Sequence, residues 1–232
     1  MMDTSLQAPN RHIHDRSAID AMQADYSDRL RKQDWEVRSV SLDVARNLVE
    51  LFHYSQGASN TATYLHGLFR KGEIFDNACF GIVWWIPPTK TAAQATFSEN
   101  WEGVLSLSRM VIVPEAPKNA CSFLIARSLK LIDRLRWPCL VTYADGWQGH
   151  TGSVYRASGW EHVGETKPER VYVTSYGRMV ARKAGPKTRT HAEMLAAGFR
   201  CLGSFPKQKF IQKIDAILVE HGQQPFKVRA SI

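Results

Sequence analysis

In the first part of the chain, short apolar segments typical of strands alternate with segments whose apolar residues are spaced as in a helix. Residues 36–40 have the pattern of a short strand, and Ser41 can cap a helix that follows it. Residues 61–70 are ambiguous, with a helix slightly favoured. Apolar residues are nearly continuous from 72 to 87, which predicts a hairpin that turns near residues 76–77 and has a second strand buried on both faces. A polar loop is expected over residues 89–100.

The stretch from 101 to 160 has the clearest order of elements. Residues 101–114 predict a long strand, 115–122 a loop and 123–136 a helix. Residues 139–145 predict a second strand, which leads into a polar loop. Because a helix-length connection separates the two strands, we expect them to run parallel around Val111 and Val141, whereas the earlier hairpins are antiparallel.

The two ends of the chain show different patterns. Residues 1–16 show no periodic pattern of apolar residues. Residues 17–32 have an apolar stripe at helical spacing, which predicts a helix on the outside of the domain. After residue 160 we expect strands over 161–165 and 170–175. Two amphipathic helices are then expected, over 190–199 and 205–219. The apolar stripe of the second helix consists of Phe210, Ile211, Ile214 and Leu218.

Together these elements predict an α/β fold with a mixed central sheet flanked by helices. We expect a partly disordered extension over residues 1–34, a catalytic domain over 35–180 and a basic, helical C-terminal extension over 181–232. No run of about 18 apolar residues occurs, so no membrane span is expected. The polar first ten residues lack an apolar signal core, which favours the cytoplasm. A homodimer is one alternative for the assembly.

Charge is unevenly distributed along the chain. The net charge is +8 and the isoelectric point is about 9.4. Between residues 178 and 213 the acidic side chain Glu193 stands among many lysines and arginines. This asymmetry predicts an anionic partner, such as nucleic acid or a phosphorylated ligand. The four cysteines are widely spaced, which indicates buried thiols and argues against a zinc site built from close pairs.

The loop over residues 115–122 is a candidate phosphate site. The first turn of the helix after it presents free N–H groups, and small residues such as Ala120 and Ser122 let a ligand approach the backbone. Lys118 adds a positive charge. This composition suits the pyrophosphate of coenzyme A, and an ordinary strand-to-helix turn is the alternative.

Five further residues are candidates for catalysis. His53 and Tyr54 end a predicted helix before a polar loop. They form the wall of a site, or they are a surface histidine and a half-buried tyrosine without a functional role. Arg109 lies in an apolar strand, where its charge requires a carboxylate partner or a ligand. Asp145 ends a predicted parallel strand, where α/β sheets bind ligands, or it caps the next segment. Tyr155 can donate a proton to a thiolate, or its ring can pack in the core.

Two segments of the sequence resemble the GNAT acetyltransferase superfamily. Val111–Pro114 matches the strand that precedes the cofactor loop of that family, although Ala120 and Ser122 replace its glycines. Tyr155-Arg-Ala-Ser-Gly159-Trp160 matches the later tyrosine and glycine-aromatic pattern. The resemblance implies an acetyltransferase-like domain over residues 35–180, acetyl-CoA as cofactor and a tyrosine that protonates the thiolate. The expected cofactor contacts are Val111, Val113, Lys118, Asn119, Ala120 and Ser122.

Residues 37–180 also resemble the Mom family of phage DNA-modification proteins, more closely. The similarity lies in the segment from Leu107 to Ile112, the loop ending at Ser122, Thr142-Tyr-Ala-Asp145 and the segment from His150 to Trp160. It implies conversion of adenine in double-stranded DNA to N6-carbamoylmethyladenine with acetyl-CoA, which protects phage DNA from host restriction. The family positions with functional weight correspond to Arg109, Ser122, Asp145 and Tyr155.

The implied product has consequences for cofactor and substrate. Its methylene linkage cannot arise by simple acyl transfer, which points to a redox metal, most plausibly Fe²⁺, with His53, Tyr54 and Asp145 as candidate ligands. Adenine must also leave the base stack, and Trp147 is the best candidate to stack on it. Expected phosphate contacts are Arg182, Lys183, Lys187, Arg189, Lys207 and Lys209.

Two other functions are compatible with the same residues. A conventional N-acetyltransferase would act on a small amine or a protein without DNA. A non-catalytic DNA-binding protein would bind DNA with salt sensitivity and leave every nucleoside unaltered.

Overall fold

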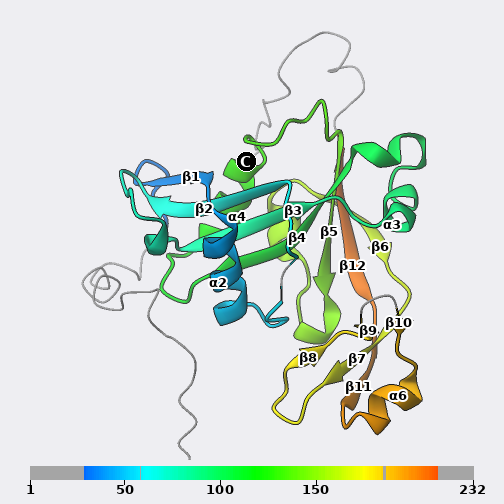
Figure 1. Cartoon of the computed structure of the whole chain (residues 1–232). Coiled ribbons are helices and arrows are strands. Elements are labelled where there is room, and N and C mark those ends of the chain that lie inside the picture. Colours follow the sequence, from blue (N-terminus) through cyan, green and yellow to red (C-terminus); the bar gives the residue numbers. More distant parts are fainter. Residues whose placement is uncertain (1–28, 58, 185–186, 214–232) are drawn as a thin grey trace, which may run out of the picture.

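The centre of the molecule is a seven-stranded mixed sheet (Figure 1). The computed structural model describes residues 29–57, 59–184 and 187–213. The strands, in spatial order, are β1 (Trp35–Ser39), β2 (Tyr64–Arg70), β3 (Gly81–Ile86), β4 (Val104–Ile112), β5 (Cys139–Asp145), β12 (Lys207–Lys213) and β6 (Glu161–Glu165). β4 and β5 are parallel, and the other neighbouring pairs are antiparallel. The expected mixed sheet is therefore confirmed.

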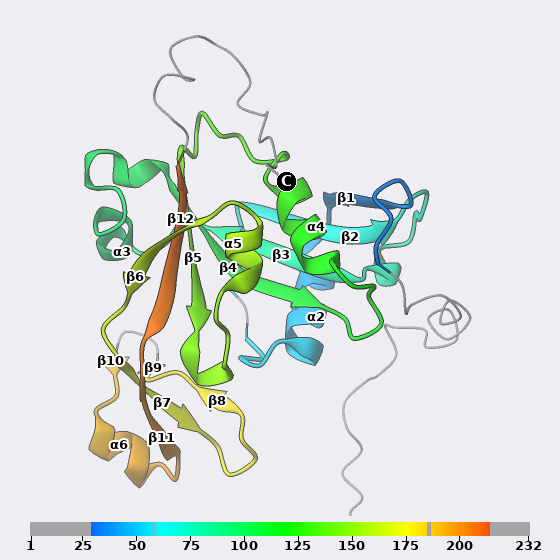
Figure 2. The ribbon, with the colours of Figure 1, turned by 180° about the vertical axis from the view of Figure 1, so that it is seen from behind.

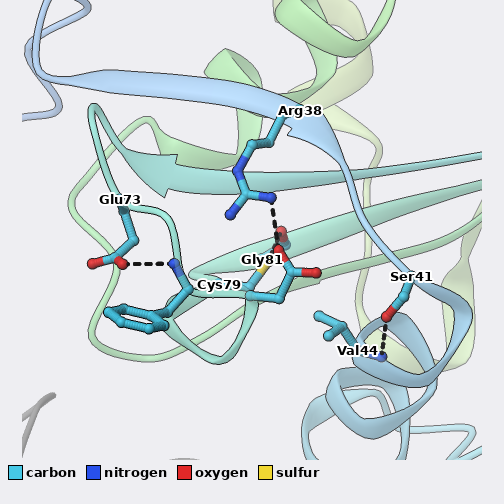
Figure 3. Close-up of polar contacts among 8 residues, drawn as sticks. Arg38, Ser41, Val44, Glu73, Cys79 and Gly81 are labelled. Atoms are coloured by element: carbon cyan, nitrogen blue, oxygen red, sulfur yellow. Dashed lines mark hydrogen bonds and ion pairs between the residues drawn. The ribbon is translucent and has the colours of Figure 1, made fainter.

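Helices cover both faces of this sheet. α2 (Leu42–Phe52) packs on one face, and α4 (Ala120–Ser128) and α5 (Ser153–Ala157) lie on the other (Figures 1 and 2). The expected cap of α2 is present, because the Ser41 side chain accepts a hydrogen bond from the Val44 amide (Figure 3). α4 is shorter than the helix expected over 123–136. No helix in the described part of the chain is both long and apolar enough to cross a membrane.

A smaller lobe lies below the end of β5 in Figure 1. It contains a three-stranded sheet in the order β11–β7–β8, with β7 over Glu169–Val173, β8 over Met179–Val180 and β11 over Arg200–Phe205. A two-stranded pair, β9 (Lys183–Ala184) and β10 (Lys187–Thr188), and helix α6 (His191–Ala196) complete it. The helix expected over 190–199 and the strands expected over 161–165 and 170–175 are thus present.

The segment 205–219 was expected to be a helix, and this is wrong for its described part. Residues 207–213 form β12, which lies between β5 and β6 in the central sheet. Phe210 and Ile211 are both buried although they are adjacent, which is typical of a strand covered on both faces. Residues 214–219 lie outside the described residues, as do residues 1–28.

The chain before β4 also differs from expectation. Residues 64–70, for which a helix was favoured, form β2 between β1 and β3. The hairpin partner of β3 is β2 rather than residues 72–80, which form a connection with a short 3₁₀ turn, η2 (Asp76–Ala78). Gly67 marks a close approach within β2, because a β-carbon there would collide with the Val40, Phe69 and Cys79 side chains.

Other connections are partly ordered. Residues 89–100, expected as a polar loop, contain helix α3 (Lys90–Gln94) and the start of the 3₁₀ segment η3 (Ser98–Gly103). β3 is buried on both faces, as expected, and its Trp84 and Trp85 are among the largest fully buried side chains. The core therefore lies on both sides of β3 and of the first half of β4. β4 is the strand from which the site described below is built.

Candidate active site

β4 and β5 separate in the middle of the sheet. Their parallel pairing joins Val104–Leu107 to Cys139–Thr142, but β4 continues to Ile112 and β5 to Asp145. At this point β4 contains a bulge against β3, because Trp85 is opposite Leu107 and Trp84 is opposite Arg109. Ser108 is the extra residue, and its hydroxyl donates to the Trp84 carbonyl oxygen at 3.2 Å. A bulge bends its strand, which helps to open the wedge between β4 and β5.

A cavity of about 330 Å³ lies at this wedge. Its walls come from the end of α2, from β4 and β5, and from residues 149–155. All five predicted catalytic residues line it: His53, Tyr54, Arg109, Asp145 and Tyr155. Residues from four separate segments of the sequence are thus brought to one place by the fold.

Asp145 lies at the end of β5 and is only 5% exposed. One carboxylate oxygen, Oδ2, accepts a hydrogen bond from the Tyr54 hydroxyl. The other, Oδ1, lies 2.8 Å from Nζ of Lys207, which is opposite Asp145 in the register of β5 and β12. Asp145 precedes the 3₁₀ turn η4 (Gly146–Gln148), but its side chain makes no capping hydrogen bond there. The carboxylate is held by two side chains rather than used as a cap.

Tyr155 is presented by the short helix α5, which begins after Gly152. The φ angle of Gly152 is +72°, and a β-carbon there would overlap the ring of Phe210. Tyr155 is 8% exposed and packs against Trp160 and Phe210. Burial raises the pKa of Tyr155, so its hydroxyl stays protonated at neutral pH and can act as a proton donor.

His53 follows the last turn of α2 and is held in one tautomer. The Ser55 amide donates to Nδ1 of His53 at 3.2 Å, so Nδ1 is unprotonated and the ring hydrogen is on Nε2. Burial, together with the positive charge of Arg109 and the proximity of His150, lowers the pKa of His53 to about 4. The ring is therefore neutral at physiological pH, and it lies 4.3 Å from the ring of Tyr54.

Arg109 satisfies its guanidinium with backbone oxygens. Nε donates to the Gly57 carbonyl oxygen at 3.0 Å and a terminal nitrogen donates to the Ser108 carbonyl oxygen at 2.7 Å. Burial lowers the pKa of Arg109 from its usual value. The side chain therefore ties the bulge in β4 to the loop after α2 and places a positive charge at the cavity wall.

The expected cofactor contacts do not line this cavity. Asn119 has a left-handed backbone with φ of 70° and precedes α4, and the Ser122 hydroxyl donates to its carbonyl oxygen at 3.1 Å. The Lys118 side chain is exposed. The backbone carbonyl oxygen of Lys118 accepts a hydrogen bond from the Leu30 amide at 3.0 Å. The remaining members of the set, Val111, Val113 and Ala120, are buried.

Two residues of the site were missed or given another role in the sequence analysis. His150 lines the cavity and faces Tyr54, with ring centroids 6.1 Å apart. Its place in the polar loop after β5 is a signal that could have found it. Lys207 was expected to contact DNA and instead pairs with Asp145. Only the register of β12 brings these two together, and that strand was expected to be a helix.

The residues expected to bind iron do not form a recognisable metal centre. Within the described ranges, no three His, Cys, Asp or Glu side chains are arranged to hold a metal ion. Oδ2 of Asp145 accepts from Tyr54, and Oδ1 is within ion-pair distance of Lys207 but makes no hydrogen bond with the described residues. The expectation of Fe²⁺ bound by His53, Tyr54 and Asp145 therefore gains no support from this arrangement.

The expected DNA contacts have different environments. Trp147 is half-buried, with its ring edge-to-face with Tyr54 at 5.7 Å. Arg182 and Lys183 are exposed, and Arg182 donates to the Arg189 carbonyl oxygen at 3.0 Å. Besides Lys207, two further lysines have internal partners: Lys187 pairs with Glu193 at 2.6 Å, and Lys209 donates to the Ala95 carbonyl oxygen at 3.2 Å.

Solved structures with similar overall shape are acetyltransferases, at low sequence identity. An N-acetyltransferase from Staphylococcus aureus Mu50 is 9% identical, with a TM-score of 0.46 over 78% of this chain and 99% of that one. A CoA-bound acetyltransferase from Bacillus subtilis is 9% identical, with a TM-score of 0.47 over 78% and 98%. A spermidine N-acetyltransferase from Vibrio cholerae, bound to CoA and spermine, is 11% identical, with a TM-score of 0.44 over 78% and 96%.

Sequence comparison gives a more specific result. No curated protein matches the chain significantly. The Mom protein family matches residues 34–211, a range that includes every residue of the cavity and the first five residues of β12, 207–211. This chain is a member of the Mom protein family.

Proposed function

We propose that this protein modifies adenine in double-stranded DNA with a two-carbon unit from acetyl-CoA. The product would be N6-carbamoylmethyladenine, as the family resemblance implies, and the reaction would protect phage DNA from restriction in the host cytoplasm. The observation that carries this proposal is the convergence of His53, Tyr54, Arg109, Asp145 and Tyr155 on one cavity where β4 and β5 separate. Ligands of α/β proteins commonly bind at the carboxyl ends of such strands.

The overall reaction sets what the site must do. A bond forms between adenine N6 and the methyl carbon of the acetyl group, and that carbon loses two electrons to an external oxidant. The thioester bond breaks, the carbonyl carbon bonds to an ammonia-derived nitrogen, and the thiolate of coenzyme A takes a proton. Attack of N6 on the thioester carbonyl would give N6-acetyladenine instead. The proposal therefore includes an oxidant and an ammonia equivalent as co-substrates.

Tyr155 is suited to the thiolate step. Its hydroxyl is protonated at neutral pH because burial raises its pKa, and it lines the cavity together with Leu107 and Met110 of β4. Donation of this proton to the departing sulfur would make coenzyme A a better leaving group. Arg109, at the same wall, would stabilise negative charge that develops on the thioester oxygen.

Asp145 is suited to accept a proton from adenine N6. Tyr54 and Lys207 fix the orientation of its carboxylate, so little reorganisation is needed when the substrate arrives. His53 is neutral, because its pKa is lowered to about 4, and its Nε2–H group can donate a hydrogen bond at the cavity wall. In this assignment Tyr155 is the proton donor and Asp145 is the proton acceptor at the same cavity.

The positive charge of the chain supports DNA as substrate. The net charge of +8 favours a polyanion, and exposed Arg182 and Lys183 lie on the smaller lobe near the end of β5. Adenine N6 is paired inside a duplex, so the base must turn out of the stack before it can reach Asp145.

The test is mass spectrometry of nucleosides from cells that express the protein, with Asp145→Asn and Lys130→Gln as matched variants. The native protein and Lys130→Gln, whose exposed site follows α4, should yield the modified adenosine, and Asp145→Asn should not. An unmodified adenosine pool from soluble native protein would reject the proposal. Thiol release from acetyl-CoA with simple amines and no DNA would instead favour a conventional acetyltransferase.

A further inference from the structure

A second cavity, also of about 330 Å³, lies on the other side of Asp145. It is formed between the η4 turn after β5 and the small β11–β7–β8 sheet, below the end of β5 in Figure 1. Its walls include Trp147, Arg170, Tyr172, Arg182, Lys183 and Lys207. None of these six residues lines the first cavity.

Asp145 is shared by both cavities. Its Oδ2 contacts Tyr54, which lines the first cavity, and its Oδ1 contacts Lys207, which lines the second. Trp147 lines the second cavity while the edge contact of its ring with Tyr54 reaches the first. The two spaces therefore meet at the Asp145 carboxylate.

The second cavity has the charge of an anion site. Arg170, Arg182 and Lys183 are exposed at its walls, and Lys207 lies at its inner end beside Asp145. Apart from Asp145, the acidic side chain at its walls is Glu169. Guanidinium and ammonium groups at a cavity rim bind phosphate oxygens.

The remaining walls suit a flat, uncharged ring. Trp147 is half-buried, Tyr172 is buried with its hydroxyl 2.7 Å from Nδ1 of His191, and Val171, Met179 and Phe205 add apolar surface. Aromatic walls beside basic side chains are typical of proteins that bind single nucleotides of a strand. Base and phosphate can thus be recognised at one opening.

We propose that this second cavity is the acceptor site, which takes one nucleotide turned out of a DNA strand and presents its base to Asp145 from the side opposite the acyl donor. This inference rests on the proposed function, because it supplies the entry for the substrate of that reaction. Donor and acceptor must meet at one point without competing for the same space, and two cavities that share one carboxylate meet that requirement. Arg170, Arg182 and Lys183 contact the phosphates, and Trp147 is the stacking surface.

Two cavity-filling variants of the full-length protein test the inference. Ala181→Trp and Thr188→Trp place bulk in the second cavity from different segments, and neither residue lines the first cavity. The control is Lys130→Trp, at an exposed residue after α4 that lines neither cavity. The probes are a short single-stranded oligonucleotide that contains adenine and, separately, acetyl-CoA.

Both filled variants should bind the oligonucleotide roughly tenfold or more weakly, the loss expected when a stacking surface is blocked. Acetyl-CoA binding and the melting temperature should stay close to those of the native protein, as should every property of the control. The oligonucleotide should not displace acetyl-CoA from the native protein, because the two sites are separate.

The outcomes separate this inference from the proposed function. Unchanged oligonucleotide binding in both filled variants, no binding by the native protein, or displacement of acetyl-CoA by the oligonucleotide would overturn the acceptor site. If the native protein modifies adenine in cells despite such a result, the proposed function stands and the base enters elsewhere. If the filled variants lose binding but the native protein leaves adenine unmodified, the nucleotide site stands and the proposed function fails.

Discussion

Lys207 and Asp145 lie opposite each other on the antiparallel strands β12 and β5, and their side chains form an ion pair of 2.8 Å. The carboxylate is buried, whereas the lysine side chain is 42% exposed. The pair joins a strand from the end of the described chain to the residue at the centre of the site. Both residues lie within the range 34–211 that matches the Mom protein family.

Lys207→Met should lower both stability and modification. The change leaves the buried Asp145 carboxylate with the Tyr54 hydroxyl as its remaining partner, at an expected cost of about 1–3 kcal/mol in the free energy of unfolding. Denaturant titration measures this cost. Lys213→Met, at the exposed end of the same strand, is the control and should change stability by less than about 0.5 kcal/mol. If Lys207→Met lowers the free energy of unfolding no more than Lys213→Met does, the ion pair does not stabilise the fold.

Tyr155→Phe should slow thioester cleavage without loss of acetyl-CoA binding. The phenylalanine keeps the packing against Trp160 and Phe210 but removes the proton donor. The expected decrease in kcat is about 100-fold or more, measured as release of free thiol. Tyr64→Phe, at a tyrosine outside the cavity walls, is the control. A kcat within twofold of the native value, by an order-of-magnitude standard, would assign Tyr155 a packing role only.

Gly152→Ala should destabilise the protein and displace Tyr155. The left-handed backbone costs about 1–2 kcal/mol for alanine, and the new β-carbon would also overlap the Phe210 ring. Gly177→Ala measures the backbone cost alone, because Gly177 has a φ of +80° with open space around it. The melting temperature should fall clearly further for Gly152→Ala. A smaller fall than for Gly177→Ala would mean that α5 does not depend on this contact.

Stability should decrease as the pH falls from about 6.5 to about 4. His66 is buried, and burial lowers its pKa from 6.5 to about 4 in the folded protein. The unfolded chain therefore binds the extra proton within this window, so that acid favours unfolding, by on the order of 3 kcal/mol for this residue once the pH is below both values. His53 acts in the same direction.

Urea titrations across this pH range measure the effect. His66→Asn should reduce the pH dependence, even though loss of the hydrogen bond to Ser128 lowers stability at every pH. His162→Gln, at an exposed position of β6, is the control. A pH slope that is identical in His66→Asn and the native protein would show that His66 does not titrate as a buried group.

Arg109 and Asp145 could be singled out because each departs from the apolar pattern of its strand. Arg109 is a charge in an apolar strand, and Asp145 is a carboxylate at the end of another. Their position on β4 and β5 follows from the helix-length connection that makes those strands parallel. The sequence could therefore predict that these residues meet, although the bulge at Ser108 that widens the gap has no marker of its own.

The part that could not be predicted depends on pairing between distant segments. Phe210 and Ile211 fit the stripe of an amphipathic helix as well as a strand covered on both faces, and the choice is made by β5 and β6 on either side. This ambiguity hid the Lys207–Asp145 pair. The second cavity was hidden for the same reason, because it exists only where the small β11–β7–β8 sheet meets the end of β5.

The proposed function requires the cavity at Asp145 to transfer carbon from acetyl-CoA to adenine in DNA. Acetyl-CoA with both acetyl carbons labelled with ¹³C, added to an extract with plasmid DNA and the purified protein, tests this directly by mass spectrometry of the DNA nucleosides. We expect a modified adenosine that carries both labelled carbons with the native protein and none with Asp145→Asn. Label that is absent from adenosine with the native protein, or present equally with Asp145→Asn, would contradict it.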